Sequence, residues 1–351
     1  MGEGAGKVTL TTETQWHRED LKLETRGLQP IVTPMSSNLP TGFVYDPIYK
    51  EHLAGVDHPE CPERLDAILE GLAAAKLDSV LLKLAPREAT LPEITACHDA
   101  GYVQLVKDEI AAGEAQLSTG DTAVTTLSWE AALMAAGGAE AAVDAVLAGR
   151  ARNAFCAVRP PGHHACPGRG MGFCIFNNIA IAARHAQRQH KVGKVAIVDW
   201  DVHHGNGTQE IFYEDGSVFY FSTHQYPWYP FTGAAAETGR AAGQGCVLNC
   251  PFDAGAGRRD IVGAFTDRLL PAARRFKPEL VLISAGFDAH VDDPLGGLSL
   301  TDEDFVELTR MVLAVARETA NGRVVSLLEG GYNLSTLGKT VAGHVKALTE
   351  T

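Results

Sequence analysis

The sequence contains no long apolar segment and no recognisable targeting signal. No stretch approaches about 18 consecutive apolar residues, the length at which a membrane-spanning helix becomes a candidate. The opening residues from Met1 to Gly6 have neither the basic flank nor the apolar centre of a secretion signal. We therefore expect a soluble, unsecreted protein with no membrane partner, and we predict a cytoplasmic location.

Positive charge and paired cysteines are also scarce. The 30 lysines and arginines stand against 43 aspartates and glutamates, which gives a net charge of −13. This balance argues against a nucleic-acid partner, because binding to a phosphate backbone needs a positive surface, and it favours a cationic or neutral substrate. The seven cysteines form no CxxC motif, so we expect mostly buried free thiols in a reducing compartment.

The chain of 351 residues divides into a short irregular stretch and a long patterned one. Residues 1–40 have no sustained periodicity and end in a group of prolines, which predicts an extended N-terminal arm. Residues 41–351 show no internal repeat, linker or change of composition, so we expect a single large domain there.

Short apolar runs within this domain indicate strands that are buried on both faces. They cover residues 42–45, 154–158, 195–198, 218–221, 280–283 and 324–328. Segments with helical spacing cover residues 63–75, 129–147, 178–190, 260–276, 301–319 and 334–348. The alternation predicts an α/β fold with a doubly wound, mainly parallel sheet and helices on both faces.

The motif DWDVHHGNG directly follows the apolar run 195–198. It therefore lies at the carboxyl end of a strand, where open α/β sheets bind ligands. Charged and imidazole side chains that leave a buried strand need a compensating partner. Because residues i and i+2 of an extended backbone face the same way, Asp201 and His203 can reach one metal ion. A buried hydrogen-bond network is the alternative.

A second carboxylate motif, SAGFDAH, follows the apolar run 280–283. Its Asp288 would complete an Asp–His–Asp set with Asp201 and His203, and such a set leaves an open position for water and substrate, as in catalytic zinc sites. His290 is a competing ligand, and a helix cap is the alternative role for Asp288.

Two further motifs supply groups for proton transfer and hydrogen bonding. PPGHHA follows the strand over 154–158 and carries His163 and His164, of which one can act as a general base and the other as its electrostatic partner. EGGYN follows the run 324–328, and the Tyr332 hydroxyl can donate to a developing oxyanion. Exposed histidines and an ordinary loop tyrosine are the alternatives.

Five ordered motifs, PPGHHA, GFCIFNN, VDWDVHHGNGTQ, SAGFDAH and EGGYN, together resemble the zinc-dependent histone deacetylase family. The likeness is to its class II branch, within a superfamily that also contains acetylpolyamine amidohydrolases, and it extends from about Gly42 to the C-terminus. The resemblance implies an arginase-like α/β catalytic domain over residues 41–351 that hydrolyses an acyl amide on a lysine-type amine.

The resemblance also implies two bound metal ions. It assigns one catalytic zinc ion to Asp201, His203 and Asp288. It further implies a structural potassium ion beside the zinc, which leaves no residue-type signature because main-chain oxygens hold it. The matching residues for potassium are Asp199, Asp201, His203, Ser222 and Thr223.

The catalytic residues carried over from the family are His163, His164 and Tyr332, with Asp199 orienting the first histidine. Asn206 stands opposite His164, where class I relatives have aspartate. Without a negative partner, His164 should have a lowered pKa and stay neutral. The implied reaction has zinc and Tyr332 polarise the acyl carbonyl, while His164 takes the proton of the attacking water and later protonates the leaving amine.

Aromatic residues near these motifs resemble the walls of the family's narrow tunnel, which holds an aliphatic lysine stem. Gly172 and Phe173 form one wall, and Tyr229 in the loop YPWYPF is the candidate for the opposite wall. We expect Trp228, in the same loop, to belong to the core instead.

The substrate choice depends on the tunnel entrance. The segment from His58 to Arg64 resembles the entrance loop, and part of it resembles a constriction found in polyamine-selective members. Those members place a carboxylate at the gate to receive an internal ammonium, whereas Leu295 occupies that position here. Because an apolar gate gives a buried ammonium no counter-charge, we expect an acylated lysine of a peptide or protein as the substrate.

Two other readings remain open. Arginase-like enzymes use related Asp/His sites, but those sites hold two manganese ions and more acidic ligands. A catalytically silent binding protein of the same fold would have lost a ligand or the tyrosine, and every matched position is intact.

Overall fold

The structure is a computed structural model that describes residues 1–2 and 39–350. The predicted arm over residues 1–40 lies almost entirely outside these residues. From residue 39 onward the described chain belongs to one unit, Met35–Thr351.

Eight strands of the described chain form one sheet in which every neighbouring pair is parallel. The strand order is β2-β1-β3-β8-β7-β4-β5-β6. The strand bounds are β1 Thr41–Val44, β2 Leu82–Leu84, β3 Asn153–Cys156, β4 Val195–Asp199, β5 Val218–Gln225, β6 Val247–Phe252, β7 Leu280–Ala285 and β8 Val324–Leu328.

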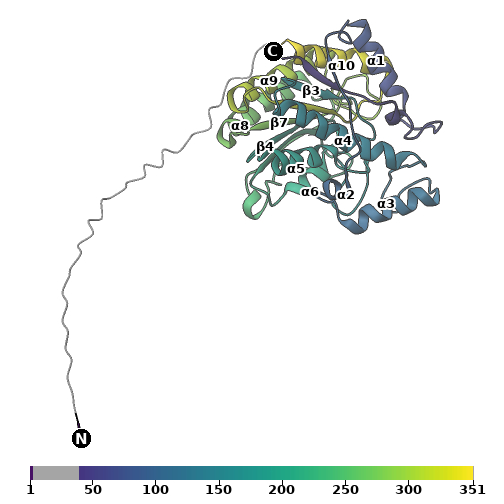
Figure 1. The fold of residues 1–351 in the computed structure, drawn as a ribbon. Helices are drawn as coiled ribbons and strands as arrows, with labels where there is room; N and C mark the ends of the chain where they lie inside the picture. Colours follow the sequence, from purple (N-terminus) through teal and green to yellow (C-terminus); the bar gives the residue numbers. More distant parts are fainter. Residues whose placement is uncertain (3–38, 351) are drawn as a thin grey trace. The chain divides into compact units, whose positions relative to one another are not determined.

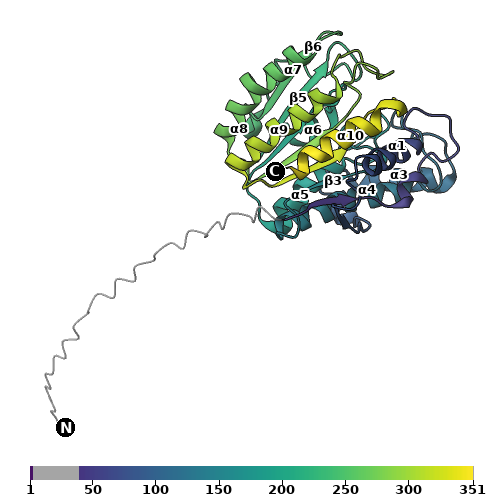
Figure 2. The same ribbon diagram turned by 90° about the horizontal axis from the view of Figure 1, so that it is seen from above.

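Helices cover both faces of this sheet, as the apolar strands require. In Figure 1, β3, β7 and β4 lie between a group with α4, α5 and α6 and a group with α8, α9 and α10, and Figure 2 shows α10 beside α1. No helix of the described chain is long and apolar enough to cross a bilayer. The helix bounds are α1 Glu63–Ala74, α2 Leu91–Ile94, α3 Ala100–Ala112, α4 Ser128–Leu147, α5 Asn178–His190, α6 Asn206–Phe212, α7 Arg258–Ala264, α8 Leu270–Phe276, α9 Asp302–Thr319 and α10 Leu334–Thr349.

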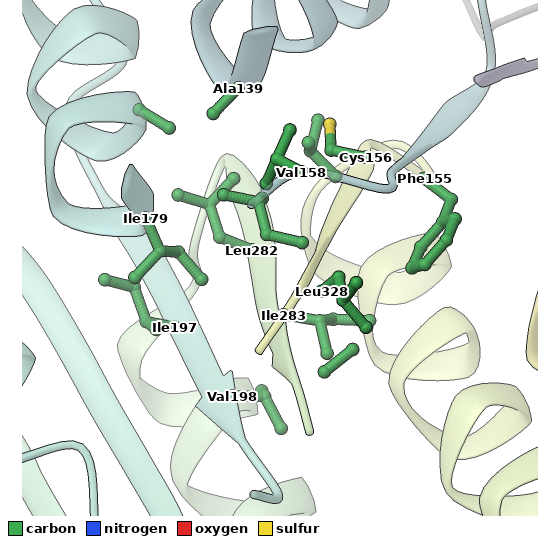
Figure 3. Packing of buried hydrophobic residues seen from close by; sticks show 14 of the residues in the cluster. Ala139, Phe155, Cys156, Val158, Ile179, Ile197, Val198, Leu282, Ile283 and Leu328 are labelled. Atoms are coloured by element: carbon green, nitrogen blue, oxygen red, sulfur yellow. The ribbon is translucent and has the colours of Figure 1, made fainter. Parts of the chain in front are cut away.

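The core is apolar on both sides of the central strands. Successive residues of a strand point to opposite faces, and consecutive residues such as Leu282 and Ile283 are both fully buried. On the face covered by α10, Phe155 of β3 packs against His344, with ring centroids 5.5 Å apart. Figure 3 shows how such side chains fill the space between strands and helices. Two buried faces explain why the strands read as unbroken apolar runs.

The predicted fold class is confirmed, with differences in detail. All six expected strands are present, and β2 and β6 are added; β2 was missed because it is a three-residue edge strand and mostly not buried. The expected helix over 260–276 is interrupted, since a π-turn at Phe265–Leu269 separates α7 from α8. Five of the seven cysteines are buried, whereas Cys61 and Cys246 are half-buried, and all seven are free thiols.

The four central strands place the predicted motifs together. β3, β8, β7 and β4 are neighbours in the sheet, and each is followed at its carboxyl end by one of the four polar motifs. Motifs more than 150 residues apart in the sequence therefore meet at one edge, which is where open parallel sheets bind ligands.

Candidate active site

Asp201, His203 and Asp288 converge at this edge. Their ligand atoms all lie within 4.8 Å of one another, and Nδ1 of His203 is 3.1 Å from both Asp201 Oδ1 and Asp288 Oδ2. Main-chain N–H groups fix the carboxylates, because Val202 donates to Asp288 and Gly330 donates to Asp201, each over 2.8 Å. His290, the competing ligand, lies instead 3.5 Å from Asp302.

Two glycines leave room for these carboxylates. A Cβ atom on Gly286 would overlap Asp201 Oδ2, and one on Gly330 would overlap Asp288 Oδ2. Both glycines therefore let neighbouring main chain approach the ligand set closely. The glycines of SAGFDAH and EGGYN are thus needed for the close packing of the ligand set, and not only for the turns in which they lie.

The charges of the three groups fit a divalent cation. Burial, followed by the negative charge of Asp201, raises the pKa of Asp288 to about 7. Burial disfavours the imidazolium of His203, but hydrogen bonds to Asp201 and Asp288 outweigh it and raise its pKa to about 10. Two buried carboxylates at this separation need positive charge between them. A set of two carboxylates and one imidazole is one that zinc accepts.

His163 is held by acidic neighbours. Its Nδ1 is 3.0 Å from Asp199 Oδ2, which also accepts a hydrogen bond from the Tyr220 hydroxyl. Burial opposes the charged imidazole, but the charges of Asp199, Asp201 and Glu329 raise the pKa of His163 well above its usual value. His163 therefore tends to carry a proton.

His164 has the opposite character. Its Nδ1 is 2.8 Å from Oδ1 of Asn206, whose amide nitrogen lies 3.2 Å from Cys166 Sγ. Since Asn206 presents its oxygen, His164 carries its hydrogen on Nδ1 and leaves Nε2 free to accept a proton. Burial, reinforced by the charges of His163 and His203, lowers the pKa of His164 well below its usual value. The adjacent histidines therefore divide into a charged and a neutral member.

Asp293 and Arg64 fix the position of Tyr332, one through its main chain and the other through its ring. Its main-chain N–H donates to Asp293 over 2.7 Å, and the Arg64 guanidinium lies 5.0 Å from the ring centroid. Burial, followed by the charge of Asp288, raises the pKa of the Tyr332 phenol well above its usual value. The phenol therefore stays protonated and can act as a hydrogen-bond donor.

A pocket of about 240 Å³ leads to these groups. The Phe173 ring stands 6.0 Å from the Tyr332 ring, and the Tyr229 ring stands 5.3 Å from His164. The expectation that Trp228 belongs to the core is wrong, because this residue is 40% exposed and lines the pocket. The pocket is lined by Asp121, His164, Gly172, Phe173, His203, Trp228, Tyr229, Leu295 and Tyr332.

Gly172 and His58 support this pocket in different ways. Gly172 has a φ of +56°, and a Cβ there would overlap the His164 ring, so the absence of a side chain leaves room for that ring. The His58 ring does not line the pocket itself but packs edge-on against Phe173, with centroids 4.6 Å apart. Gly172 therefore leaves room for His164, and His58 supports the wall that Phe173 forms.

Two carboxylates organise the site in ways that the sequence motifs do not indicate. Glu329 accepts hydrogen bonds from the main-chain N–H groups of Gly162 and His163 and from the Ser284 hydroxyl, and so joins three motifs. Asp121 accepts hydrogen bonds from the Gly172 N–H and the Tyr229 hydroxyl. These carboxylates bind mostly main-chain donors, which no residue pattern reveals.

The residues predicted to hold potassium lie on the paired strands β4 and β5 or shortly after β4. Ser222 and Thr223 belong to β5, and Ser222 is in register with Asp199 at the end of β4. Asp201 and His203 follow directly after β4. The five residues therefore lie near one another beside the Asp–His–Asp set.

Comparison with known proteins agrees with this arrangement. Residues 58–348 match the family described as "Histone deacetylase domain". The chain belongs to the histone deacetylase family. This membership confirms the resemblance drawn from the motifs and places the chain among hydrolases that act on amide bonds.

This member of the histone deacetylase family is similar to two curated proteins and to one solved structure, as follows. Histone deacetylase 14, chloroplastic, from Arabidopsis thaliana is 42% identical over 308 residues, covering 83% of this chain and 73% of that protein. Polyamine deacetylase HDAC10 from Homo sapiens is 41% identical over 307 residues, again 83% of this chain but only 45% of that protein. The solved structure "Crystal Structure of HDA15 HD domain" is 38% identical with a TM-score of 0.84, covering 90% of this chain and 89% of that chain.

Proposed function

We propose that the chain is a zinc-dependent deacylase that removes an acetyl or other acyl group from lysine side chains of peptides or proteins. The observation that carries this proposal is the convergence of Asp201, His203 and Asp288 with His164 and Tyr332 at one pocket. These residues offer ligands for a metal ion, a base and a hydrogen-bond donor that can act on a single amide group.

Asp201, His203 and Asp288 would hold the zinc ion and leave a position open for substrate. Bound there, zinc supplies a Lewis acid that polarises the acyl carbonyl and makes water more acidic. Asp199, Asp201, His203, Ser222 and Thr223 would hold a structural potassium ion, which belongs to the same proposal. The register of β4 with β5 supports that placement.

The residues of the chain divide the remaining work. Neutral His164 accepts the proton of the attacking water at Nε2, because Asn206 holds the hydrogen on Nδ1. The protonated Tyr332 phenol donates a hydrogen bond to the oxygen on which negative charge develops. His163, kept positive by Asp199, adds to the positive field. The proton held by His164 then passes to the departing lysine amine.

The pocket walls favour a lysine stem. Phe173 and Tyr229 offer rings to an aliphatic chain, and Leu295 presents an apolar group at the mouth. The Trp228 indole donates to the Leu295 carbonyl over 3.1 Å, which ties that mouth together. An internal ammonium of a polyamine would meet no carboxylate at Leu295, and its desolvation would be uncompensated there.

An acetylpolyamine is the second candidate substrate. The human relative is named a polyamine deacetylase, and the Asp121 carboxylate lines the pocket. Asp121 is already engaged by the Gly172 N–H and the Tyr229 hydroxyl, which weakens it as a counter-charge. A catalytically silent binding protein is less well supported, because every group that the reaction needs is in place.

The test compares kcat/KM for an acetyl-lysine peptide and an N-acetylated polyamine on one zinc-loaded preparation, with a hydroxamate chelator as inhibitor control. We expect the peptide to be preferred. Leu295→Glu should shift the ratio toward the polyamine by about tenfold or more, the factor that ~1.4 kcal/mol of charge pairing gives. Leu295→Gln introduces a side chain of the same size as glutamate but without its charge, and it should leave the ratio nearly unchanged.

Two results would contradict this proposal in different ways. A wild-type preference for the polyamine would leave the amide chemistry in place and refute the lysine assignment. Turnover of neither substrate, in a preparation that holds zinc, would favour the silent binding protein. The cytoplasmic location stays a prediction, and two plant relatives carry the word chloroplastic in their names.

A further inference from the structure

A second group of side chains of the types that bind metal ions lies between α4 and α5, which pack against each other (Figure 1). Asp144 comes from α4, and His185 and His190 come from α5. Nε2 of His185 is 2.7 Å and Nε2 of His190 is 2.6 Å from the same atom, Asp144 Oδ1. Two imidazole nitrogens and a carboxylate oxygen therefore converge on one point.

A buried carboxylate lies behind His185. Nδ1 of His185 is 3.4 Å from Glu140 Oε1, and the Glu140 side chain is fully buried. Neither Glu140 oxygen nor His185 Nδ1 makes a hydrogen bond of good geometry within the described part of the chain. Arg87 reaches Glu140 Oε2 at 2.9 Å as an ion-pair partner. In metal sites a ligating histidine donates its other ring N–H to such a carboxylate, which aims the free nitrogen at the ion.

The surroundings allow an ion to enter. The side chains of Asp144 and His190 are 38% and 27% exposed, whereas that of His185 is 4% exposed. Ligand atoms about 2.0–2.2 Å from zinc in a tetrahedral site lie roughly 3.3 Å apart. The exposed Asp144 side chain can reach that spacing by moving less than ~1 Å from each imidazole, and water can complete the coordination.

We propose that Asp144, His185 and His190 bind a second divalent cation of the zinc class, with Glu140 orienting His185. This site is separate from the Asp201–His203–Asp288 set, and it does not depend on the substrate assignment. Its ion joins α4 to the last turn of α5. The cation therefore acts as a structural clamp between two helices on one face of the sheet.

The clamp is connected to the active site through α5. The Asn177 side chain caps this helix by accepting from the Ala180 N–H, and its amide nitrogen donates to the Ala165 carbonyl in the histidine loop. Asn178, the first residue of α5, donates to the Pro160 carbonyl at the other end of that loop. Anchoring α5 at its far end therefore steadies the loop that carries His163 and His164.

The test measures bound zinc per full-length chain after chelator stripping, reloading with zinc and removal of free metal. His190→Ala should lower the stoichiometry by one relative to the wild type. Gln189→Ala, at the neighbouring exposed position, is the matched control and should leave it unchanged. Equal zinc content in the wild type and His190→Ala would overturn the proposal, whatever the content of the active site.

A second measurement separates the two sites. In an Asp288→Asn background, which removes a ligand of the other set, zinc should still raise the melting temperature. Adding His190→Ala should abolish that rise, and a rise that persists would overturn the proposal. Glu140→Gln should weaken zinc binding by about 10–100-fold without abolishing it, as expected when a carboxylate that orients a ligating histidine is removed.

Discussion

At the scale of single residues, Tyr332 makes the clearest separation between chemistry and metal binding. Tyr332 lines the pocket, while Asp201, His203 and Asp288 form the candidate metal set without it. Tyr332→Phe should therefore lower kcat by about 100-fold or more, the usual loss when one oxyanion donor is removed, and leave zinc content unchanged.

The matched control for this variant is Tyr49→Phe. The Tyr49 hydroxyl donates to the Met134 carbonyl, away from the pocket, so its loss should reduce stability slightly and spare turnover. Steady-state kinetics and metal analysis on both variants decide the matter. Near-normal turnover of Tyr332→Phe would remove the phenol from the reaction.

Asn206 sets the protonation of His164, and a charged replacement should change the pH dependence. Burial and the nearby positive charges keep the pKa of His164 well below its usual value. Asn206→Asp places a negative charge beside Nδ1, which stabilises the imidazolium and raises the pKa of His164 above its value in the wild type. As the pH falls, His164 then becomes protonated at a higher pH than in the wild type. The acid limb of the kcat/KM profile should therefore shift to higher pH. Superimposable profiles for the two proteins would contradict this role.

At the scale of elements, the segments that follow the central strands depend on glycine as well as on ligands. Gly286 follows β7, and a Cβ there would overlap the Asp201 carboxylate. Gly286→Ala should therefore weaken zinc binding and lower kcat/KM by at least about tenfold, a cost of ~1.4 kcal/mol or more for displacing a ligand.

Gly263→Ala is the control for that substitution. Gly263 lies in α7, and a Cβ there would meet nothing within 4 Å. The exchange should keep zinc content and activity, and raise stability by up to about 1 kcal/mol through helix propensity. Equal zinc affinity in Gly286→Ala and Gly263→Ala would refute the close-approach argument.

The strands at the centre of the sheet are the elements that the sequence predicts most directly. Strands β4 and β7 could be predicted because their buried faces leave apolar runs, and in β8 only Ser326 breaks the run. The candidate metal ligands could be proposed because they closely follow β4 and β7. The three-residue edge strand β2 has no such run, and the π-turn before α8 leaves the helical spacing almost intact. The local sequence pattern predicts the type of an element better than it predicts where that element is interrupted.

The site could be predicted only where a residue type carries the role. Asp201 and His203 are recognisable from their chemistry and spacing, whereas Glu329 works by accepting main-chain N–H groups, which any sequence provides. The cluster of Asp144, His185 and His190 depends on how two helices face each other, and the sequence of each helix alone shows only helical spacing. Tertiary packing, not sequence spacing, brings those groups together.

At the scale of the whole molecule, net charge governs the encounter with substrate. A charge of −13 attracts cationic peptides over a Debye length of about 10 Å at 0.1 M salt. The value of kcat/KM for an acetyl-lysine peptide flanked by lysine and arginine should fall several-fold between roughly 50 mM and roughly 500 mM NaCl. A peptide of equal length with neutral flanks should be nearly insensitive. Parallel salt dependence for both peptides would contradict long-range attraction.

The position of β8 in the sheet has a consequence for synthesis of the chain. β8 comes after the other seven strands of this sheet in the described chain, yet it lies between β3 and β7 in the middle of the sheet. A nascent chain that lacks β8 exposes two apolar inner strand edges, which are prone to mispairing. The sheet, and with it the pairings that bring Asp201, His203 and Asp288 to Tyr332, therefore closes only after residues 324–328 have left the ribosome, and until then the unpaired edges favour aggregation.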